Sequence, residues 1–228
     1  MIPSNDKAEG GRSPQGVVLL HGFGGLPIQT ALLAARLRRA GFAVLNPFYP
    51  SWQASLPEIV DRLQPRIARF AAQFDTIHGV GHSMGGLVLR AAFARDRPTN
   101  LGHVVTLGTP HGGSELADLI HRVGLHRLIL NRAAPALRTA RDSQIDAWLG
   151  PIDYPLGVIA GNRPEMRLLT DAVFRAPHDG KVSVAATHVI GQKDHIVMPV
   201  THVAMLHDGQ VAHQAIHFLQ RARFERPG

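Results

Sequence analysis

The residues best suited to chemistry in this sequence are a serine and the glycines that flank it. The segment Gly81-His82-Ser83-Met84-Gly85-Gly86 matches the pattern G-x-S-x-G, in which a serine lies on a sharp turn between a strand and a helix. The pattern alone is weak, but an apolar run, TIHGV, precedes the serine and an amphipathic run, GGLVLRAAF, follows it. We therefore predict that Ser83 is a nucleophile held above a sheet. The alternative is a glycine-rich turn with an incidental serine.

A serine nucleophile needs a general base that an acid aligns, because its alcohol is weakly reactive at neutral pH. In the chain order expected for such a turn, the acid and the base both follow the serine. Two acids compete for the first role, Asp179 in the polar turn PHDGKV and Asp194 in QKD. We favour Asp179, because Gly180 lets the turn tighten and the position ends a core element. Asp194 remains the alternative, with a turn or capping role as its other interpretation.

The base must be chosen among several histidines, since the chain contains 14. We favour His202, which follows the apolar run HIVMPV and precedes the last helix, and His195 is the alternative. His188 is expected inside a short strand. His213 and His217 have the spacing of metal ligands on a helix, but HQAIH lacks the glutamate of a zinc-protease helix. A solvated helix face explains that pair better.

Two backbone amides are candidates for stabilising negative charge on a substrate oxygen. Met84 directly follows the serine, and Phe23 lies in the loop HGFGG, whose glycines allow close approach of the backbone to a ligand. The loop fits neither G-x-G-x-x-G nor a P-loop, which disfavours phosphate binding. We predict that the amides of Phe23 and Met84 form an oxyanion hole.

The rest of the chain alternates between short apolar runs and helical patterns. Strands are expected at 17–21, 43–45, 76–81, 103–107, 156–160 and 188–190, and helices at 27–41, 56–74, 84–95 and 205–221. Pro65 predicts a kink or break in the second of these helices. Such alternation is typical of an α/β fold, a mostly parallel sheet with helices on both faces. Ligands of these sheets gather at the carboxyl ends of the strands.

Residues 112–154 interrupt this alternation, because they contain helical patterns but no strand. We expect a small helical cap inserted above the site, with ordinary surface helices as the alternative. Its apolar residues either line an acyl-binding pocket or form the core of the cap: Leu125, Leu128, Ile129, Leu130 and Trp148. Residues 1–15 are expected to be a flexible tail, and 16–228 a single domain that contains the cap.

The composition excludes several classes of protein. Hydrophobic residues make up 45% and charged residues 18% of the 228 residues, which argues against wholesale disorder. The absence of cysteine excludes disulfides and cysteine nucleophiles. No apolar run reaches the roughly 18 residues of a membrane span. The N-terminus lacks the apolar segment of a signal peptide, so a cytoplasmic location is expected.

The net charge of +7 comes mainly from arginines spread along the chain. A nucleic-acid-binding protein concentrates such residues in a stripe or a motif, so no nucleic-acid partner is expected. A solvated surface is the favoured interpretation, and a patch for an anionic partner is the alternative.

Four segments in order, HGFGG, GHSMGG, TLGTPHGG and HDGKVS, resemble the α/β-hydrolase superfamily, and more narrowly bacterial lipases and small serine esterases. TLGTPHGGS is similar to a strand and loop of the Pseudomonas and Burkholderia lipases, and the compact chain is similar to the minimal Bacillus lipase. The resemblance covers the chain from Val17 to about Leu219. It implies an α/β-hydrolase fold with Ser83 as nucleophile, Asp179 as acid and His202 as base.

The resemblance implies cleavage of carboxylic esters or lipid-like substrates through an acyl-enzyme, without a metal or organic cofactor. Calcium is not expected, because the larger lipases place a calcium-binding aspartate just after the catalytic histidine, whereas His202 is followed by Val-Ala-Met. Acyl transfer, or cleavage of amides or thioesters, uses the same three residues and is the first alternative. A non-catalytic binding protein of this fold is the second.

Overall fold

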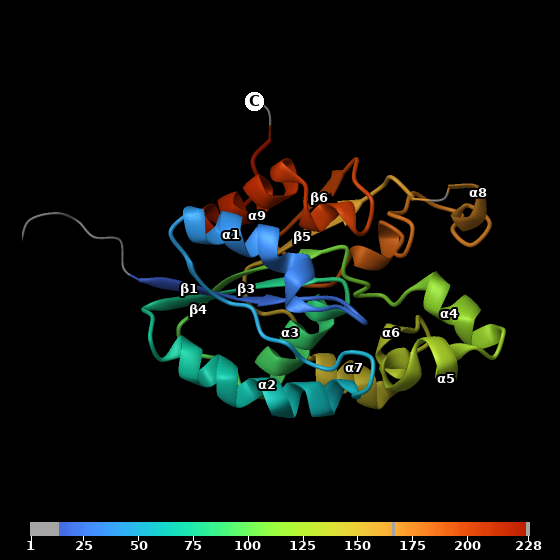
Figure 1. Ribbon diagram of the computed structural model, residues 1–228, viewed down its shortest axis with the longest axis horizontal. Coiled ribbons are helices and arrows are strands. Elements are labelled where there is room, and N and C mark those ends of the chain that lie inside the picture. Colours follow the sequence, from blue (N-terminus) through green and yellow to red (C-terminus); the bar gives the residue numbers. More distant parts are fainter. Residues whose placement is uncertain (1–13, 166, 227–228) are drawn as a thin grey trace, which may run out of the picture.

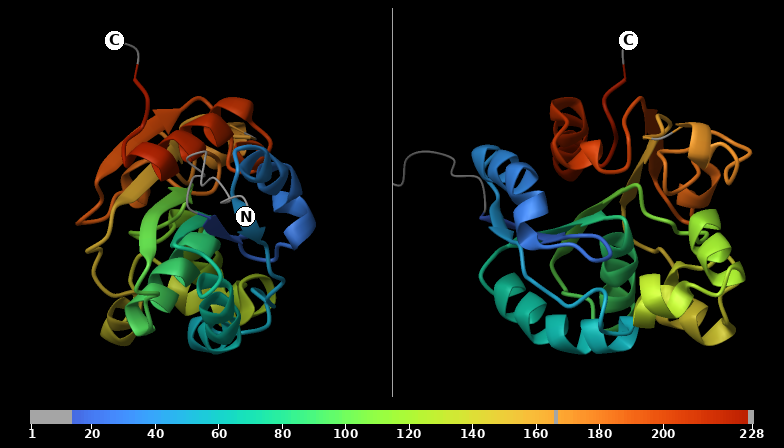
Figure 2. Two further views of the ribbon diagram at one scale, coloured as in Figure 1. Left: turned by 90° about the vertical axis from the view of Figure 1, so that its left-hand side faces the viewer. Right: turned by 45° about the vertical axis from the view of Figure 1, so that its right-hand side comes forward.

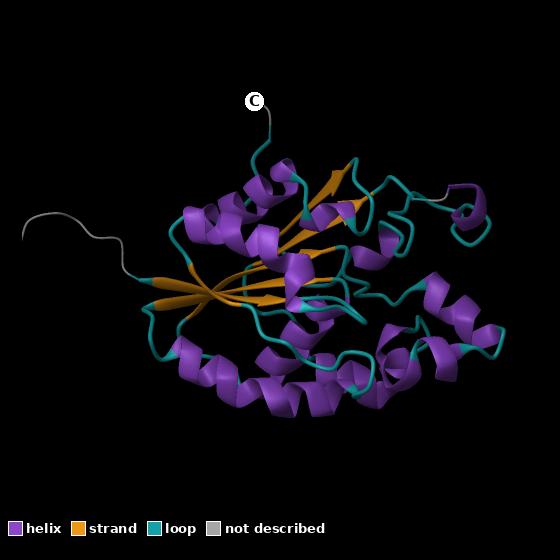
Figure 3. Cartoon of the chain, viewed as in Figure 1, coloured by secondary structure: helices purple, strands orange, loops and turns teal. Residues whose placement is uncertain are grey.

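The centre of the molecule is a parallel sheet. The computed structural model describes residues 14–165 and 167–226, and within them six strands pair in the order β2-β1-β3-β4-β5-β6. Every neighbouring pair is parallel, as the ribbon and the cartoon show (Figure 1 and Figure 3). The strands are β1 (Gln15–Leu20), β2 (Ala43–Leu45), β3 (Thr76–His82), β4 (Leu101–Leu107), β5 (Leu156–Gly161) and β6 (Asp194–Met198). This confirms the predicted α/β class.

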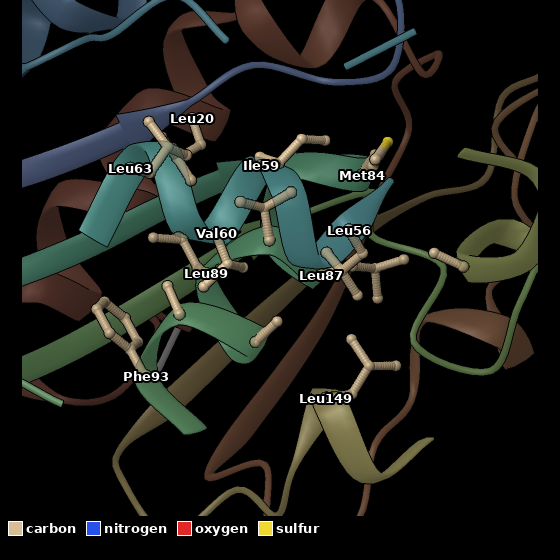
Figure 4. Close-up of a cluster of buried hydrophobic side chains, with 14 of the residues drawn as sticks. Leu20, Leu56, Ile59, Val60, Leu63, Met84, Leu87, Leu89, Phe93 and Leu149 are labelled. Carbon is tan, nitrogen blue, oxygen red and sulfur yellow. The ribbon is translucent and has the colours of Figure 1, made fainter. Parts of the chain in front are cut away.

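Helices cover both faces of the sheet. In Figure 1, α1 (Ala31–Arg39) and α9 (Gly209–Arg221) lie on one face, and α2 (Leu56–Ala71) and α3 (Met84–Arg95) lie on the other. In β1, Val18 and Leu20 join the core beneath α2 and α3, while Val17 and Leu19 join the core beneath α1 and α9. Burial on both faces explains why the strands read as unbroken apolar runs. Figure 4 shows the first of these cores, with α2 and α3 side chains packed together.

Helix α2 continues through Pro65, where the sequence predicted a kink or break. Pro65 lies on the exposed face, whereas Leu63 and Ile67 on either side of it are fully buried. Proline inside a helix costs about 3 kcal/mol, but each buried aliphatic side chain contributes about 1.5–3 kcal/mol. The buried face of α2 therefore keeps both halves of the helix in place. The helix ends at Ala71, before the predicted end at residue 74.

The last strand lies further along the chain than predicted. Residues 188–190 are not a strand: Ile190 is 98% exposed, and Gly191 has a φ of +91° that turns the chain. The strand is Asp194–Met198, paired with β5. The final helical segment is also divided, because a 3-10 turn (Ala204–Leu206) precedes α9. Asp208 separates the two by capping α9, accepting the N–H groups of Gln210 and Val211.

The segment 112–154 forms helices, and some of its residues up to 137 line a cavity at the carboxyl ends of the strands, whereas its last helix packs against α3. They are α4 (Glu115–Arg122), α5 (His126–Ile129), α6 (Ala134–Leu137) and α7 (Ser143–Leu149), with a 3-10 turn at Asn131–Ala133. Figures 1 and 2 show α4, α5 and α6 grouped at one end of the molecule, whereas α7 packs against α3. A further short helix, α8 (Arg167–Thr170), follows β5.

The predicted tail, residues 1–15, falls outside the described residues except for its last two positions, and Gln15 already belongs to β1. In the described part of the chain, every helix is too short or too polar to cross a membrane.

Candidate active site

Ser83 lies on a sharp turn between β3 and α3, as its motif predicted. Its φ of 54° and ψ of −126° are rare for a residue with a side chain, and such a conformation costs about 1–3 kcal/mol. The end of β4 holds this turn. The Ser83 amide donates to the Leu107 carbonyl at 2.8 Å, and the Thr109 hydroxyl donates to the Ser83 carbonyl at 2.9 Å.

The glycines around Ser83 are required by close backbone contacts. A Cβ atom on Gly81 would lie 2.6 Å from the backbone nitrogen of Gly86. On Gly85 it would lie 2.5 Å from the carbonyl oxygens of Leu20 and His21. Helix α3 therefore begins directly against the end of β1, which brings the HGFGG loop to the serine.

Asp179 and His202 form a buried pair at the ends of β5 and β6. The Nδ1–H of His202 donates to Asp179 Oδ2 at 2.7 Å, and the two side chains are 3% and 0% exposed. Asp179 Oδ1 accepts the amides of Lys181 at 2.9 Å and Val182 at 2.8 Å. The amide of His202 also donates to the Asp179 carbonyl at 2.9 Å. With its proton on Nδ1, the imidazole presents Nε2 as a base.

The competing acid and base lie elsewhere. Asp194 pairs with Arg226 at 2.5 Å and accepts the amide of Phe224 at 2.8 Å. His195 contacts the Thr187 hydroxyl through Nε2 at 2.9 Å, and its ring stacks on His188 at 3.9 Å. Burial, followed by the neighbouring His188, lowers the pKa of His195 to about 4. The structure therefore joins Asp179 to His202 and leaves Asp194 and His195 with other partners.

The histidine pair on α9 faces solvent. His213 pairs with Glu225 at 2.8 Å, and His217 hydrogen-bonds the Arg223 carbonyl at 2.8 Å. Across residues 14–165 and 167–226, no three histidine, aspartate or glutamate side chains gather in a way that could hold a metal ion.

Ser83 and His202 line one cavity of about 210 Å³, which residues of α4, α6 and the segment between them also line. The Ser83 hydroxyl makes no hydrogen bond within the described residues. In enzymes without substrate, hydrogen bonds of this kind are often long and tighten only in the complex. Apolar side chains from the cap form one wall of the cavity: Leu116, Ala117, Ile120, Leu130 and Leu137.

The HGFGG loop lies against the serine. A Cβ atom on Gly22 would be 3.0 Å from the Ser83 Cβ, and Phe23 lines the cavity. The hydroxyl of buried Tyr49 donates to the His21 carbonyl, which anchors the start of the loop. In the part of the chain that the structure describes, the amides of Phe23 and Met84 have no acceptor. Both are therefore free to donate to a ligand.

His82 belongs to the site, although the sequence motif gave no role to the residue before the serine. Its Nε2–H donates to the His202 carbonyl at 2.9 Å, and the two rings lie 4.8 Å apart. Burial, followed by the nearby His202, lowers the pKa of His82 to about 3. A neutral His82 thus holds the backbone of His202 in place.

Most of the proposed acyl-pocket residues lie outside this cavity. Leu125, Leu128 and Ile129 are 46%, 72% and 40% exposed and do not line it. Trp148 lies on α7, where the Arg95 guanidinium is 5.8 Å from its ring. Leu130 is the residue of that set that lines the cavity. The other cap residues of the wall come from α4 and α6.

No family model matches the chain. Orotidine 5'-phosphate decarboxylase of Bradyrhizobium sp. strain BTAi1 is 30% identical over 156 residues, which is 65% of this chain. The match spans 60% of that relative, less than two thirds of its length.

Solved structures of lipolytic enzymes superpose on most of the chain. Lipase BlEst2 of Bacillus licheniformis, in mature form, has a TM-score of 0.68 at 18% identity over 89% of this chain and 90% of that one. Phospholipase PlaB of Legionella pneumophila has a TM-score of 0.69 at 18% identity, over 92% of this chain and 60% of that one. The metagenomic carboxyl esterase MGS0156 has a TM-score of 0.63 at 18% identity, over 84% of this chain and 65% of that one.

Together with the parallel sheet and the strand–turn–helix at Ser83, these superpositions show that the chain has the α/β-hydrolase fold. The resemblance to bacterial lipases and esterases that the motifs indicated is thereby confirmed at the level of the fold.

Proposed function

We propose that this protein is a serine hydrolase that cleaves carboxylic esters through an acyl-enzyme. The observation that carries the proposal is the Asp179–His202 pair, 2.7 Å between Oδ2 and Nδ1, whose imidazole lines the same cavity as a serine on a strained turn. An aligned imidazole beside a serine is the arrangement that activates an alcohol. The lipases and esterases of the same fold support the choice of an ester bond over an amide bond.

In this mechanism the Ser83 oxygen attacks the ester carbonyl carbon while its proton passes to Nε2 of His202. The electron pair of the carbonyl moves onto its oxygen, where the amides of Phe23 and Met84 stabilise the negative charge. The C–O bond to the alcohol then breaks, and the alcohol oxygen takes the proton from His202. A water molecule repeats both steps on the acyl-serine, which releases the acid and restores Ser83.

The cavity favours short acyl chains. Its volume of about 210 Å³ lies below the roughly 300–1,000 Å³ of sites that hold drug-sized ligands. The apolar wall from α4 and α6 suits an alkyl chain, while Ser83 and His202 lie at the polar side. We expect a preference for acetate and butyrate esters over laurate esters.

The test is the hydrolysis of p-nitrophenyl esters of increasing chain length by the wild-type protein and Ser83→Ala. We expect Ser83→Ala to lose at least about 10³-fold in kcat and to keep the wild-type circular dichroism and melting temperature. Ser143→Ala, a change at an exposed serine of α7, is the matched control and should keep full activity. Equal turnover by wild type and Ser83→Ala would refute the proposal.

Two further outcomes separate the alternatives. A fluorophosphonate probe should label wild-type protein at Ser83, and a protein of this fold that only binds ligands would stay unlabelled. Product analysis with added alcohols distinguishes hydrolysis from acyl transfer, because a transferase would form a new ester in place of the free acid.

A further inference from the structure

A second cavity, of about 480 Å³, lies on the far side of the segment that follows β4. Pro110 lines the cavity that holds Ser83, whereas the next residue, His111, lines this second one. Its walls come from α3, α7 and the loops at 150–152 and 188–191. The residues that line it and bear polar side chains are Arg90, His111, Arg141, Asp146 and His188.

Two guanidinium groups are buried at this cavity. Arg90, on α3, is 8% exposed, and the side chain of Arg141 is 5% exposed. Among the described residues, only one carboxylate lies within 4 Å of these two guanidinium groups. It belongs to Asp146, 3.9 Å from Arg141. The Asp146 side chain is 64% exposed, so solvent screens much of its charge. Buried charges are normally paired, and here the positive charge exceeds the negative.

Arg90 also keeps donors without acceptors. Its Nη1 donates to Nδ1 of His111 at 3.3 Å and its Nη2 donates to the Gly150 carbonyl at 2.8 Å. Its Nε is buried and has no hydrogen-bond partner within the described residues. A guanidinium offers five N–H donors in a planar fork that matches the two oxygens of an oxyanion.

The neighbouring groups hold both arginines in position. Arg141 donates to the carbonyls of Pro110 at 2.6 Å, His111 at 2.7 Å and Ala136 at 2.9 Å. Because His111 accepts from Arg90 at Nδ1, its proton lies on Nε2, which donates to the Thr106 hydroxyl at 3.1 Å. Burial, followed by the two arginines, lowers the pKa of His111 well below its usual value. His111 is therefore a neutral acceptor, and it supplies no negative charge to balance the arginines.

We propose that this cavity is a binding site for a small oxyanion, a phosphate or carboxylate group, held by Arg90 and supported by Arg141. The bound anion supplies the negative charge that the buried arginines lack, and the N–H groups of Arg90 that face the cavity bind it. This site is separate from the ester-hydrolysing residues, so its occupation does not depend on the reaction at Ser83.

The test is titration of the full-length protein with inorganic phosphate at constant ionic strength, followed by phosphorus NMR line broadening and by the melting temperature. A parallel titration with acetate distinguishes phosphate from carboxylate as the preferred group. The variants are Arg90→Gln, which removes the charge, and Asp146→Asn, which removes the competing exposed carboxylate. The control is Arg95→Gln, on the same helix but 43% exposed and paired with Asp61.

We expect wild-type protein to bind at least one of the two anions in the millimolar range. Arg90→Gln should weaken binding at least about tenfold, Asp146→Asn should tighten it about threefold, and Arg95→Gln should leave it unchanged. If Arg90→Gln fails to fold, the wild type and Asp146→Asn still decide. The proposal would be overturned if neither the wild type nor Asp146→Asn bound an anion in the millimolar range. It would also be overturned if folded Arg90→Gln bound the anion as tightly as the wild type. Ester turnover by the same samples is a separate readout, so failure here leaves the proposed function standing.

Discussion

Replacing Asp179 with asparagine tests the proposed base most directly, because the structure determines how the new amide must sit. Asp179 Oδ1 accepts two backbone N–H groups, from Lys181 and Val182, and Oδ2 accepts the proton of His202. In Asp179→Asn the amide oxygen should take the place of Oδ1, because an NH2 group there would face the two backbone N–H donors. The NH2 group then points at Nδ1 of His202, which forces the imidazole proton onto Nε2, and the base is lost.

The size of the effect follows from the cost of the opposite orientation. Turning the amide so that its oxygen faces His202 gives up two hydrogen bonds, at about 1 kcal/mol each, and leaves two buried donors unpaired. A cost of about 3 kcal/mol keeps only about one molecule in a hundred in the productive tautomer. The amide also lacks the negative charge that stabilises a protonated imidazole. We therefore expect kcat to fall by about 10³–10⁴.

The assay is the steady-state hydrolysis of p-nitrophenyl butyrate, with folding checked by circular dichroism. Asp194→Asn is the matched control: it changes the other candidate acid, which pairs with Arg226 at the end of the chain, and should alter kcat less than about twofold. A kcat above one tenth of wild type in Asp179→Asn would refute the reasoning. A larger loss in Asp194→Asn would transfer the role to that residue.

Two further predictions concern a glycine and a buried histidine. In Gly108→Ala the new Cβ would lie 2.9 Å from Asp179 Oδ2 and 3.1 Å from His202 Nδ1, so kcat/KM for the same ester should fall at least about tenfold. Gly124→Ala also changes a glycine of positive φ, but no atom lies within 4 Å of the new Cβ, and it should lower the melting temperature without changing the rate; equal rates in both variants would contradict this account. For His78, burial, followed by the neighbouring His103, lowers the pKa from 6.5 to about 4. Because the unfolded chain binds this proton more readily, His78 by itself should lower the free energy of unfolding by about 3 kcal/mol as the pH falls from above 6.5 to 4, and the other buried histidines add to this fall. In urea denaturation, His78→Asn should reduce the fall between pH 6.5 and pH 4 by about 3 kcal/mol relative to wild type, and an equal fall in both proteins would refute the assignment.

The sequence predicted the parts of the fold and the site that depend on short stretches of neighbouring residues. Apolar runs that alternate with helical patterns led to the parallel sheet, and the glycines around Ser83 led to the turn. Asp179 and His202 could be selected because each follows a strand, and the ends of parallel strands meet at one edge of the sheet.

Features that depend on contacts between distant segments were not predictable in this way. The apolar residues of α5 and Trp148 were candidates for the pocket by type alone, yet the faces that α4 and α6 turn inward line the cavity. The run HVI at 188–190 has the composition of a strand, but DHIVM pairs with β5 instead. The role of His82 rests on a hydrogen bond across 120 residues, and no spacing in the sequence indicates such a contact.

If Ser83 and His202 act as proposed, the position of His202 after the edge strand β6 determines when the protein becomes reactive during its synthesis. Domains tend to fold from the N-terminal side as the chain leaves the ribosome, and Ser83 emerges long before β6 can pair with β5. Until that last pairing forms, Ser83 has its turn and its neighbouring strands, but His202 is not yet beside it. On the proposed mechanism, a nascent chain of this protein therefore stays inert toward esters until its C-terminal segment has joined the sheet.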